Sequence, residues 1–277
     1  MSLSIAAALA EAKAALFASD SAALDARLLL CHILDCPPAY LHTWPDKTLS
    51  LAQQQAYFEL IAKRRDGHPV AHLLGYRDFW TLRLAVNNTT LIPRPETELL
   101  VEQALALPLP EQASVLDLGT GTGAIALALA SERPGWQLTG VDRIPAAVTL
   151  ATANQQAHQI PNVTFMHSDW FSAVESQRFD LIVSNPPYVE DNSEYLTQGD
   201  VVFEPRSALT AGHDGMDDIR RICAVARDYL SENGVIMFEH GFSQAAAVAA
   251  CLQIHGYRQI RHFNDLANLP RVTSAIR

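Results

Sequence analysis

Apolar residues repeat at helical spacing through the first 75 positions of the chain. In a first set of apolar residues, within residues 5–16, the members lie three or four positions apart. A second set repeats this spacing over residues 24–33, as the residues on one face of an α-helix do. Pro37-Pro38 separates these from a short third helix, and Ser50 is a candidate N-cap for a fourth. The first set comprises Ile5, Leu9, Ala12 and Leu16. The pattern predicts a small helical bundle over residues 1–75, either a support for the rest of the chain or a docking site for a protein partner.

The period of the pattern then changes. Residues 79–86 alternate between apolar and polar side chains, which predicts a strand, and Asn87-Asn88 indicates a turn. We therefore expect residues 76–92 to form a β-hairpin connector between the helical bundle and a larger domain over residues 93–277.

Strand and helix patterns alternate from residue 114 onward. Strands are expected at 114–118, 137–141, 163–166, 180–183 and 235–238, helices at 124–132, 145–158, 216–230 and 244–254, and closing strands at 257–263 and 272–276. Repeated strand–helix units predict an α/β fold with a doubly wound parallel sheet, in which a ligand binds beyond the carboxyl ends of the strands.

Composition places the chain among ordinary globular proteins, with 49% apolar and 18% charged residues in a length of 277. No apolar run approaches the roughly 20 residues that span a membrane, and the N-terminus lacks a secretory signature. The four cysteines form no Cys-x-x-Cys pair, so neither a zinc site nor a disulfide framework is indicated. We expect a cytoplasmic protein without a metal and without a membrane partner.

Charge is distributed unevenly along the chain. Residues 1–92 carry eight Lys/Arg and eight Asp/Glu, so the net charge of −10 belongs to residues 93–277, which carry twelve Arg and twenty-two Asp/Glu. A DNA-binding protein usually needs a basic surface to release counterions. The acidic balance therefore favours a protein or small-molecule substrate over DNA.

Three of the predicted strands end on residues suited to bind a nucleoside. The first is followed by a turn of three glycines that opens a helix, a context in which backbone N–H groups can approach a ligand. Asp142 ends the second strand, where it could accept from ribose hydroxyls or cap the following helix. After the third strand, Asp169 could accept from an adenine amino group and Trp170 could cover its ring, or they could be a surface acid and a core aromatic. The glycine-rich turn after the first strand comprises Gly119, Thr120, Gly121, Thr122 and Gly123.

Asn185-Pro186-Pro187-Tyr188 follows the fourth strand. The prolines end the strand because neither can donate to a ladder, and Pro187 restricts Pro186 to extended geometry. The Asn185 amide and the Pro186 carbonyl are then free to accept from a planar NH2 group beside the Tyr188 ring. An isolated Asn-Pro-Pro would be a plain turn, and the function depends on the neighbouring strand ends.

At these strand ends the sequence resembles the Rossmann-like S-adenosylmethionine-dependent methyltransferases, and its Asn-Pro-Pro-Tyr is similar to that of enzymes that methylate planar amino groups. Further segments resemble the PrmC/HemK family, the peptide chain release factor glutamine N5-methyltransferases. They are His72-Leu73-Leu74-Gly75-Tyr76, Phe79-Trp80, Leu91-Ile92-Pro93-Arg94-Pro95-Glu96-Thr97-Glu98 and Phe203-Glu204-Pro205-Arg206. The likeness includes the helical N-terminal part.

The resemblance implies transfer of a methyl group to the glutamine of the Gly-Gly-Gln motif in release factors, leaving S-adenosylhomocysteine. It assigns residues 119–123, Asp142, Asp169, Trp170 and Asn185 to the cofactor. It assigns the binding of the substrate glutamine to Asn185, Pro186, Pro187 and Tyr188. Asn185 and Pro186 are also given a catalytic role. Glutamine methylation of a large-subunit ribosomal protein, adenine N6 methylation of nucleic acid and a non-catalytic binding role are the alternatives. Glu190, Asp191 and Glu194 are interpreted as a solvated loop, and Glu239-His240 as a strand-end pair outside the site.

Overall fold

The structure is a computed structural model that describes residues 3–277. The described chain divides into two compact units. Unit 1 comprises the residues up to Tyr76 together with Thr197–Phe203, and unit 2 comprises Arg77–Leu196 together with Glu204–Arg277. No helix within residues 3–277 has the length and apolar composition that crossing a membrane requires.

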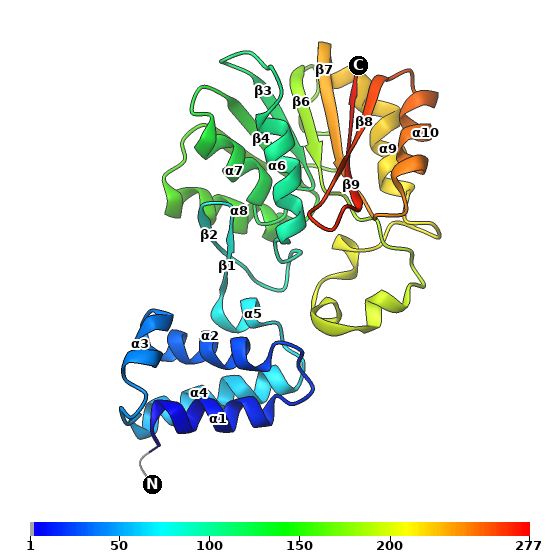
Figure 1. Cartoon of the computed structure of the whole chain (residues 1–277). Helices are drawn as coiled ribbons and strands as arrows, with labels where there is room; N and C mark the ends of the chain where they lie inside the picture. The colour runs from blue at the N-terminus through cyan, green and yellow to red at the C-terminus, as the bar shows by residue number, and fades with distance from the viewer. Residues whose placement is uncertain (1–2) are drawn as a thin grey trace. The chain divides into compact units, whose positions relative to one another are not determined.

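Unit 1 is a bundle of helices, as the apolar repeat predicts (Figure 1). Its helices are α1 (Ile5–Ala15), α2 (Ala22–Leu34), α3 (Pro38–Thr43), α4 (Leu51–Arg65) and the short α5 (Val70–Leu74), which the pattern does not predict. Ser50 caps α4: its hydroxyl accepts from Gln53 N while the Gln53 side chain accepts from Ser50 N. Tyr57 of α4 is buried and donates its hydroxyl to the Ala26 carbonyl of α2 at 3.0 Å, which joins the two helices.

A segment distant in sequence completes unit 1. Thr197–Phe203 packs with the helices through a salt bridge from Arg64 Nη1 to Asp200 Oδ1 at 2.9 Å. The Phe203 ring lies 4.4 Å from the His68 ring, centroid to centroid. Nothing in the local pattern of this segment predicts that it belongs with the helices, because both contacts join residues more than 100 positions apart.

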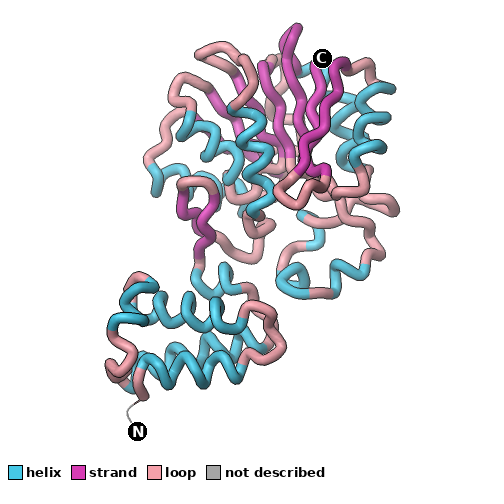
Figure 2. Tube along the Cα trace, viewed as in Figure 1, coloured by secondary structure: helices cyan, strands magenta, loops and turns pink. Residues whose placement is uncertain are grey.

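Among the described residues, unit 2 contains a seven-stranded sheet in the order β5-β4-β3-β6-β7-β9-β8 (Figure 2). Its strands are β3 (Ser114–Leu118), β4 (Gln137–Asp142), β5 (Val163–His167), β6 (Phe179–Ser184), β7 (Leu230–Glu239), β8 (Arg258–Asn264) and β9 (Pro270–Ile276). The strands from β3 to β7 run parallel, which confirms the doubly wound α/β fold. β9 runs antiparallel to β7 and β8, because the link from β8 to β9 is too short for the crossover that parallel pairing needs.

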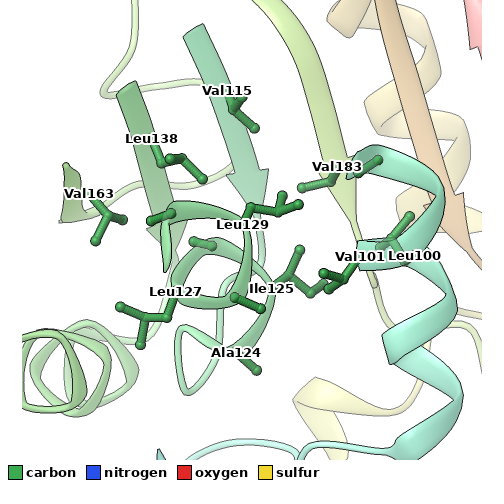
Figure 3. Close-up of a cluster of buried hydrophobic side chains, with 14 of the residues drawn as sticks. Leu100, Val101, Val115, Ala124, Ile125, Leu127, Leu129, Leu138, Val163 and Val183 are labelled. Atoms are coloured by element: carbon green, nitrogen blue, oxygen red, sulfur yellow. The ribbon is translucent and has the colours of Figure 1, made fainter. Parts of the chain in front are cut away.

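Helices cover both faces of this sheet (Figure 1). They are α6 (Glu98–Leu105), α7 (Ala124–Glu132), α8 (Pro145–His158), α9 (Asp217–Ala226) and α10 (Ala245–Ile254). Successive strand residues point to opposite faces: Val115 and Val183 pack with α6 and α7, whereas Leu116 and Ile182 pack with α9 and α10. Figure 3 shows the first cluster, with Ile125 of α7 among the side chains of α6 and the strands.

A β-hairpin lies within residues 76–92, where one is expected, but the single strand expected over residues 79–86 is wrong. The structure forms a two-stranded hairpin of β1 (Tyr76–Phe79) and β2 (Leu82–Ala85). Trp80 turns the chain with a left-handed φ of 55°, and Glu98 Oε1 accepts from its backbone N–H at 2.8 Å. The apolar alternation continues across this tight turn, so periodicity alone cannot reveal it.

The helix expected to end at Leu230 is shorter than predicted. α9 ends at Ala226, and β7 already begins at Leu230. Asn233-Gly234 is a dipeptide typical of turns, but it lies within β7, at an irregularity where the pairing with β6 shifts register. A bulge contains the same turn-forming residues as a loop, which explains the error.

Candidate active site at the carboxyl edge of the sheet

The glycine-rich turn joins β3 to α7. Gly123 has a φ of 84°, and a Cβ there would lie 2.9 Å from the Phe165 ring, so a larger residue would strain the turn. Gly119 N and Thr120 N both donate to the Val141 carbonyl near the end of β4. α7 begins directly after the turn, so its unpaired N–H groups face the space beyond the strands.

Asp142 ends β4 and is bonded to this turn. Its Oδ2 accepts from Gly121 N at 3.0 Å, and its Oδ1 accepts from Ile144 N at 2.9 Å, just before α8. Burial raises the pKa of Asp142, and these two backbone hydrogen bonds lower it. Each carboxylate oxygen can accept more than one hydrogen bond. Asp142 therefore holds the loop together and still has acceptor capacity toward a ligand.

A cavity opens beside the glycine turn. It brings together predicted residues from several strand ends: Gly119, Thr120, Gly121, Thr122, Asp142, Trp170, Asn185 and Pro187. Gly123 is not among its lining residues. Six further lining residues are not predicted from the sequence: Thr89, Thr90, Arg143, Ile144, Ser168 and Ser207. All lie in loops except Ser207, which lies in the short 3-10 helix Arg206–Ala208, and in such segments no period marks a side chain as facing a ligand.

The side chains of the neighbouring residues Asp169 and Trp170 lie in different places. Trp170 is 9% exposed and lines the cavity, and its indole N–H has no hydrogen-bond partner among the described residues. Asp169 does not line the cavity, and its carboxylate pairs with Arg221 at 2.7 Å on the surface. Ser168 lines the cavity in its place. The expected contact of Asp169 with the nucleoside is thus not supported, because the backbone directs that side chain outward.

A second cavity, of about 710 Å³, adjoins the first. Pro186, Tyr188, Glu239 and Arg271 are among its lining residues. Asn185 lines both cavities, together with Leu91, Arg94 and Ala208. The Asn-Pro-Pro-Tyr segment therefore stands at the junction of the two spaces, one beside the glycine turn and one beside Tyr188.

Two buried side chains hold this segment. Asn185 Nδ2 donates to Thr97 Oγ1 at 3.2 Å, and the Tyr188 hydroxyl donates to Glu239 Oε1 at 3.3 Å. The backbone of Tyr188 is also fixed, since its N–H donates to the Leu209 carbonyl at 3.1 Å. Asn185 and Tyr188 thus keep fixed orientations before any ligand binds.

Glu239 and His240 have different environments. Glu239 is 1% exposed and lines the second cavity, so the expectation that it lies outside the site is wrong. Burial raises the pKa of Glu239 to about 7, against the opposing effects of Thr97, Tyr188 and Arg271. The His240 ring is buried and bonds to Thr273 Oγ1 at 2.7 Å and to the Gly241 carbonyl, as expected of a satisfied strand-end histidine.

The structure also bears on the acids after Tyr188 and on metal ligands. Glu190, Asp191 and Glu194 are exposed, as a solvated loop would be. Within residues 3–277, no group of three or more His, Cys, Asp or Glu side chains is arranged to hold a metal ion.

Comparison with known proteins gives matches over both units. Residues 7–75 match the PrmC N-terminal domain family, and residues 95–215 match the methyltransferase small domain family. A release factor glutamine methyltransferase of Shewanella oneidensis is 53% identical over 255 residues, which cover 92% of this chain and 89% of the relative. One from Escherichia coli is 48% identical over 266 residues, 96% of each chain.

Solved structures share the fold. A T. thermophilus rRNA methyltransferase in complex with AdoMet and guanosine aligns with a TM-score of 0.51 and 22% sequence identity, over 73% of this chain and 49% of that one. At that identity the likeness shows the fold alone.

Proposed function

Since the chain belongs to the family of release factor glutamine methyltransferases, we propose that it transfers a methyl group from S-adenosylmethionine to the side-chain amide nitrogen of the glutamine in the Gly-Gly-Gln motif of peptide chain release factors. The observation that carries this proposal is the place of Asn185, which lines both the cavity at the glycine turn and the cavity at Tyr188. A methyl donor in the first and a side-chain amide in the second would meet there.

The first cavity fits the cofactor. The glycines at residues 119–123 let the backbone come close to the ligand, and Asp142 retains lone pairs for ribose hydroxyls. Trp170 offers an apolar face and an unpartnered indole N–H. When bound, S-adenosylmethionine supplies an electrophilic sulfonium methyl group.

The second cavity fits a glutamine side chain. Asn185, Pro186 and Tyr188 line this cavity, and we assign the Asn185 side-chain oxygen and the Pro186 backbone carbonyl as acceptors and the Tyr188 ring as the packing face. An amide NH2 has two in-plane N–H bonds, one for each acceptor, while the ring packs on the amide plane. Pro187, which lines the first cavity, keeps Pro186 extended and its carbonyl out of the sheet.

These acceptors also account for reactivity. An amide nitrogen is a poor nucleophile because its lone pair is delocalised into the carbonyl group. As the nitrogen attacks the methyl group it becomes partly positive, so the two acceptors bind the transition state more strongly than the ground state. Two such hydrogen bonds at about 1.5–3 kcal/mol each contribute about 3–6 kcal/mol, or roughly 10² to 10⁴ in rate. Proximity to the methyl group supplies much of the remainder, and the product nitrogen then loses its proton readily.

Labelling with methyl-labelled cofactor tests the proposal. We expect label on a purified release factor, and none on the same factor after the glutamine of its Gly-Gly-Gln motif is changed to glutamate. Duplex DNA and large-subunit ribosomal protein serve as competing substrates. Label on either of these, with none on the release factor, would overturn the proposal.

A further inference from the structure

Asn185 can act as an acceptor only if its side-chain amide has the correct orientation. If Oδ1 faces the substrate, it can accept a hydrogen bond from the N–H group of the substrate amide. If Nδ2 faces the substrate, two donors meet and no hydrogen bond forms. The Asn-Pro-Pro-Tyr segment is hydrogen-bonded to two buried groups that no step above uses, Thr97 at the start of α6 and Glu239 at the end of β7. Thr97 is 4% exposed and Glu239 is 1% exposed.

The hydrogen-bond inventory of these groups decides the orientation. A side-chain amide carries its donors on nitrogen and its acceptor on oxygen. Asn185 Nδ2 donates to Thr97 Oγ1 at 3.2 Å. The Tyr188 hydroxyl donates to Glu239 Oε1 at 3.3 Å.

Because Nδ2 of Asn185 is bonded to Thr97 Oγ1, Oδ1 of the same amide points away from Thr97. The Glu239 carboxyl group holds the Tyr188 hydroxyl. The two polar side chains of the Asn-Pro-Pro-Tyr segment therefore each have a buried hydrogen-bond partner.

We propose that Thr97 is a positioning residue, which orients the Asn185 amide so that Oδ1, and not the NH2 group, faces the substrate glutamine. This inference rests on the proposed function. Thr97 lines the first cavity together with Asn185 and acts through that side chain. Its effect is on turnover and on the state of Asn185, whereas a purely structural role would alter stability and cofactor affinity instead.

Paired threonine variants provide the kinetic test. Thr97→Val keeps the shape but loses the hydroxyl, and we expect it to lower kcat at least tenfold, with KM for the release factor and Kd for the cofactor within threefold of the parent. Thr97→Ser keeps the hydroxyl and should retain at least half of kcat. Thr152→Val removes a hydroxyl that bonds within α8 and is the matched control, with parental kinetics expected. Thr97→Val within twofold of the parent, or Thr97→Ser as impaired as Thr97→Val, would overturn the inference.

A spectroscopic readout does not depend on activity. The side-chain amide resonances of Asn185 are identified in the ¹⁵N spectrum by their loss in Asn185→Asp. We expect them to move in Thr97→Val and to keep their position in Thr97→Ser. Unchanged resonances in Thr97→Val would refute the inference. If the parent methylates no release factor, the proposed function fails, and the spectra still decide the orientation of Asn185.

Discussion

Arg94 forms a salt bridge with Glu204 across 110 positions of sequence, and the Glu204 side chain is fully buried. Glu204 Oε1 also accepts from Ile92 N at 2.8 Å. Two of the segments whose sequences carry the family resemblance, around Arg94 and around Glu204, therefore meet in unit 2. Arg94 lines both cavities, so the ion pair supports the wall of the candidate site.

Removing Glu204 should destabilise unit 2. Glu204→Ala leaves Arg94 and the Ile92 N–H without this acceptor, and loss of one partner of a buried pair typically costs about 3–5 kcal/mol. Urea unfolding measures the change. Asp78→Ala, which breaks an exposed pair with Arg83, is the control and should cost about 1 kcal/mol or less. Equal effects of the two variants would show that the buried pair has no special role.

Asn185→Ala should reduce turnover while leaving cofactor affinity within about tenfold. The variant loses an acceptor that strengthens only as charge develops on the substrate nitrogen. Single-turnover kinetics with a release factor and calorimetry with the cofactor separate the two effects. Near-parental turnover would remove Asn185 from the mechanism.

Asp142→Ala should weaken cofactor binding by about tenfold or more, equivalent to roughly 1.4 kcal/mol. The variant removes the acceptor proposed for the ribose and releases Gly121 N from its hydrogen bond. Titration calorimetry measures the affinity. Unchanged affinity with a lower melting temperature would instead mean that Asp142 only caps the loop before α8.

Stability should depend on pH through Glu239. Its pKa is about 7 in the folded protein, above the ordinary value near 4.3 of an unfolded chain. The folded state therefore binds more protons between these values, so this contribution to stability is full below about pH 4 and is lost as pH rises through about 7. Glu239→Gln removes the titration, so its unfolding free energy should fall less steeply than that of the parent from pH 5 to 7.

The comparison isolates Glu239 from other groups. Burial also raises the pKa of Asp117, to about 7, and lowers the pKa of His240, and both groups are present in each protein. Parallel curves for the parent and the variant would contradict the assignment to Glu239.

Local pattern was sufficient for most elements of unit 2. α7 and α8 have the predicted bounds, because their apolar periods and end signals agree. The errors fall at the Trp80 turn and at the bulge in β7. Nothing in the sequence marks the turn at Trp80, whereas Asn233-Gly234 usually marks a turn but lies within a strand. In both places the pairing of neighbouring strands decides the structure.

The sequence by itself determined the fold class, the glycine turn and the Asn-Pro-Pro-Tyr segment, because each is written in contiguous residues whose period or backbone restriction is local. Only the tertiary structure decided that Glu239 lines the second cavity, that Asp169 lies on the surface, and that Thr97 is hydrogen-bonded to Asn185. Those relationships depend on which strand ends become neighbours and which way each side chain leaves its strand. Such contacts join residues about 50 to 90 positions apart, beyond the reach of any local pattern.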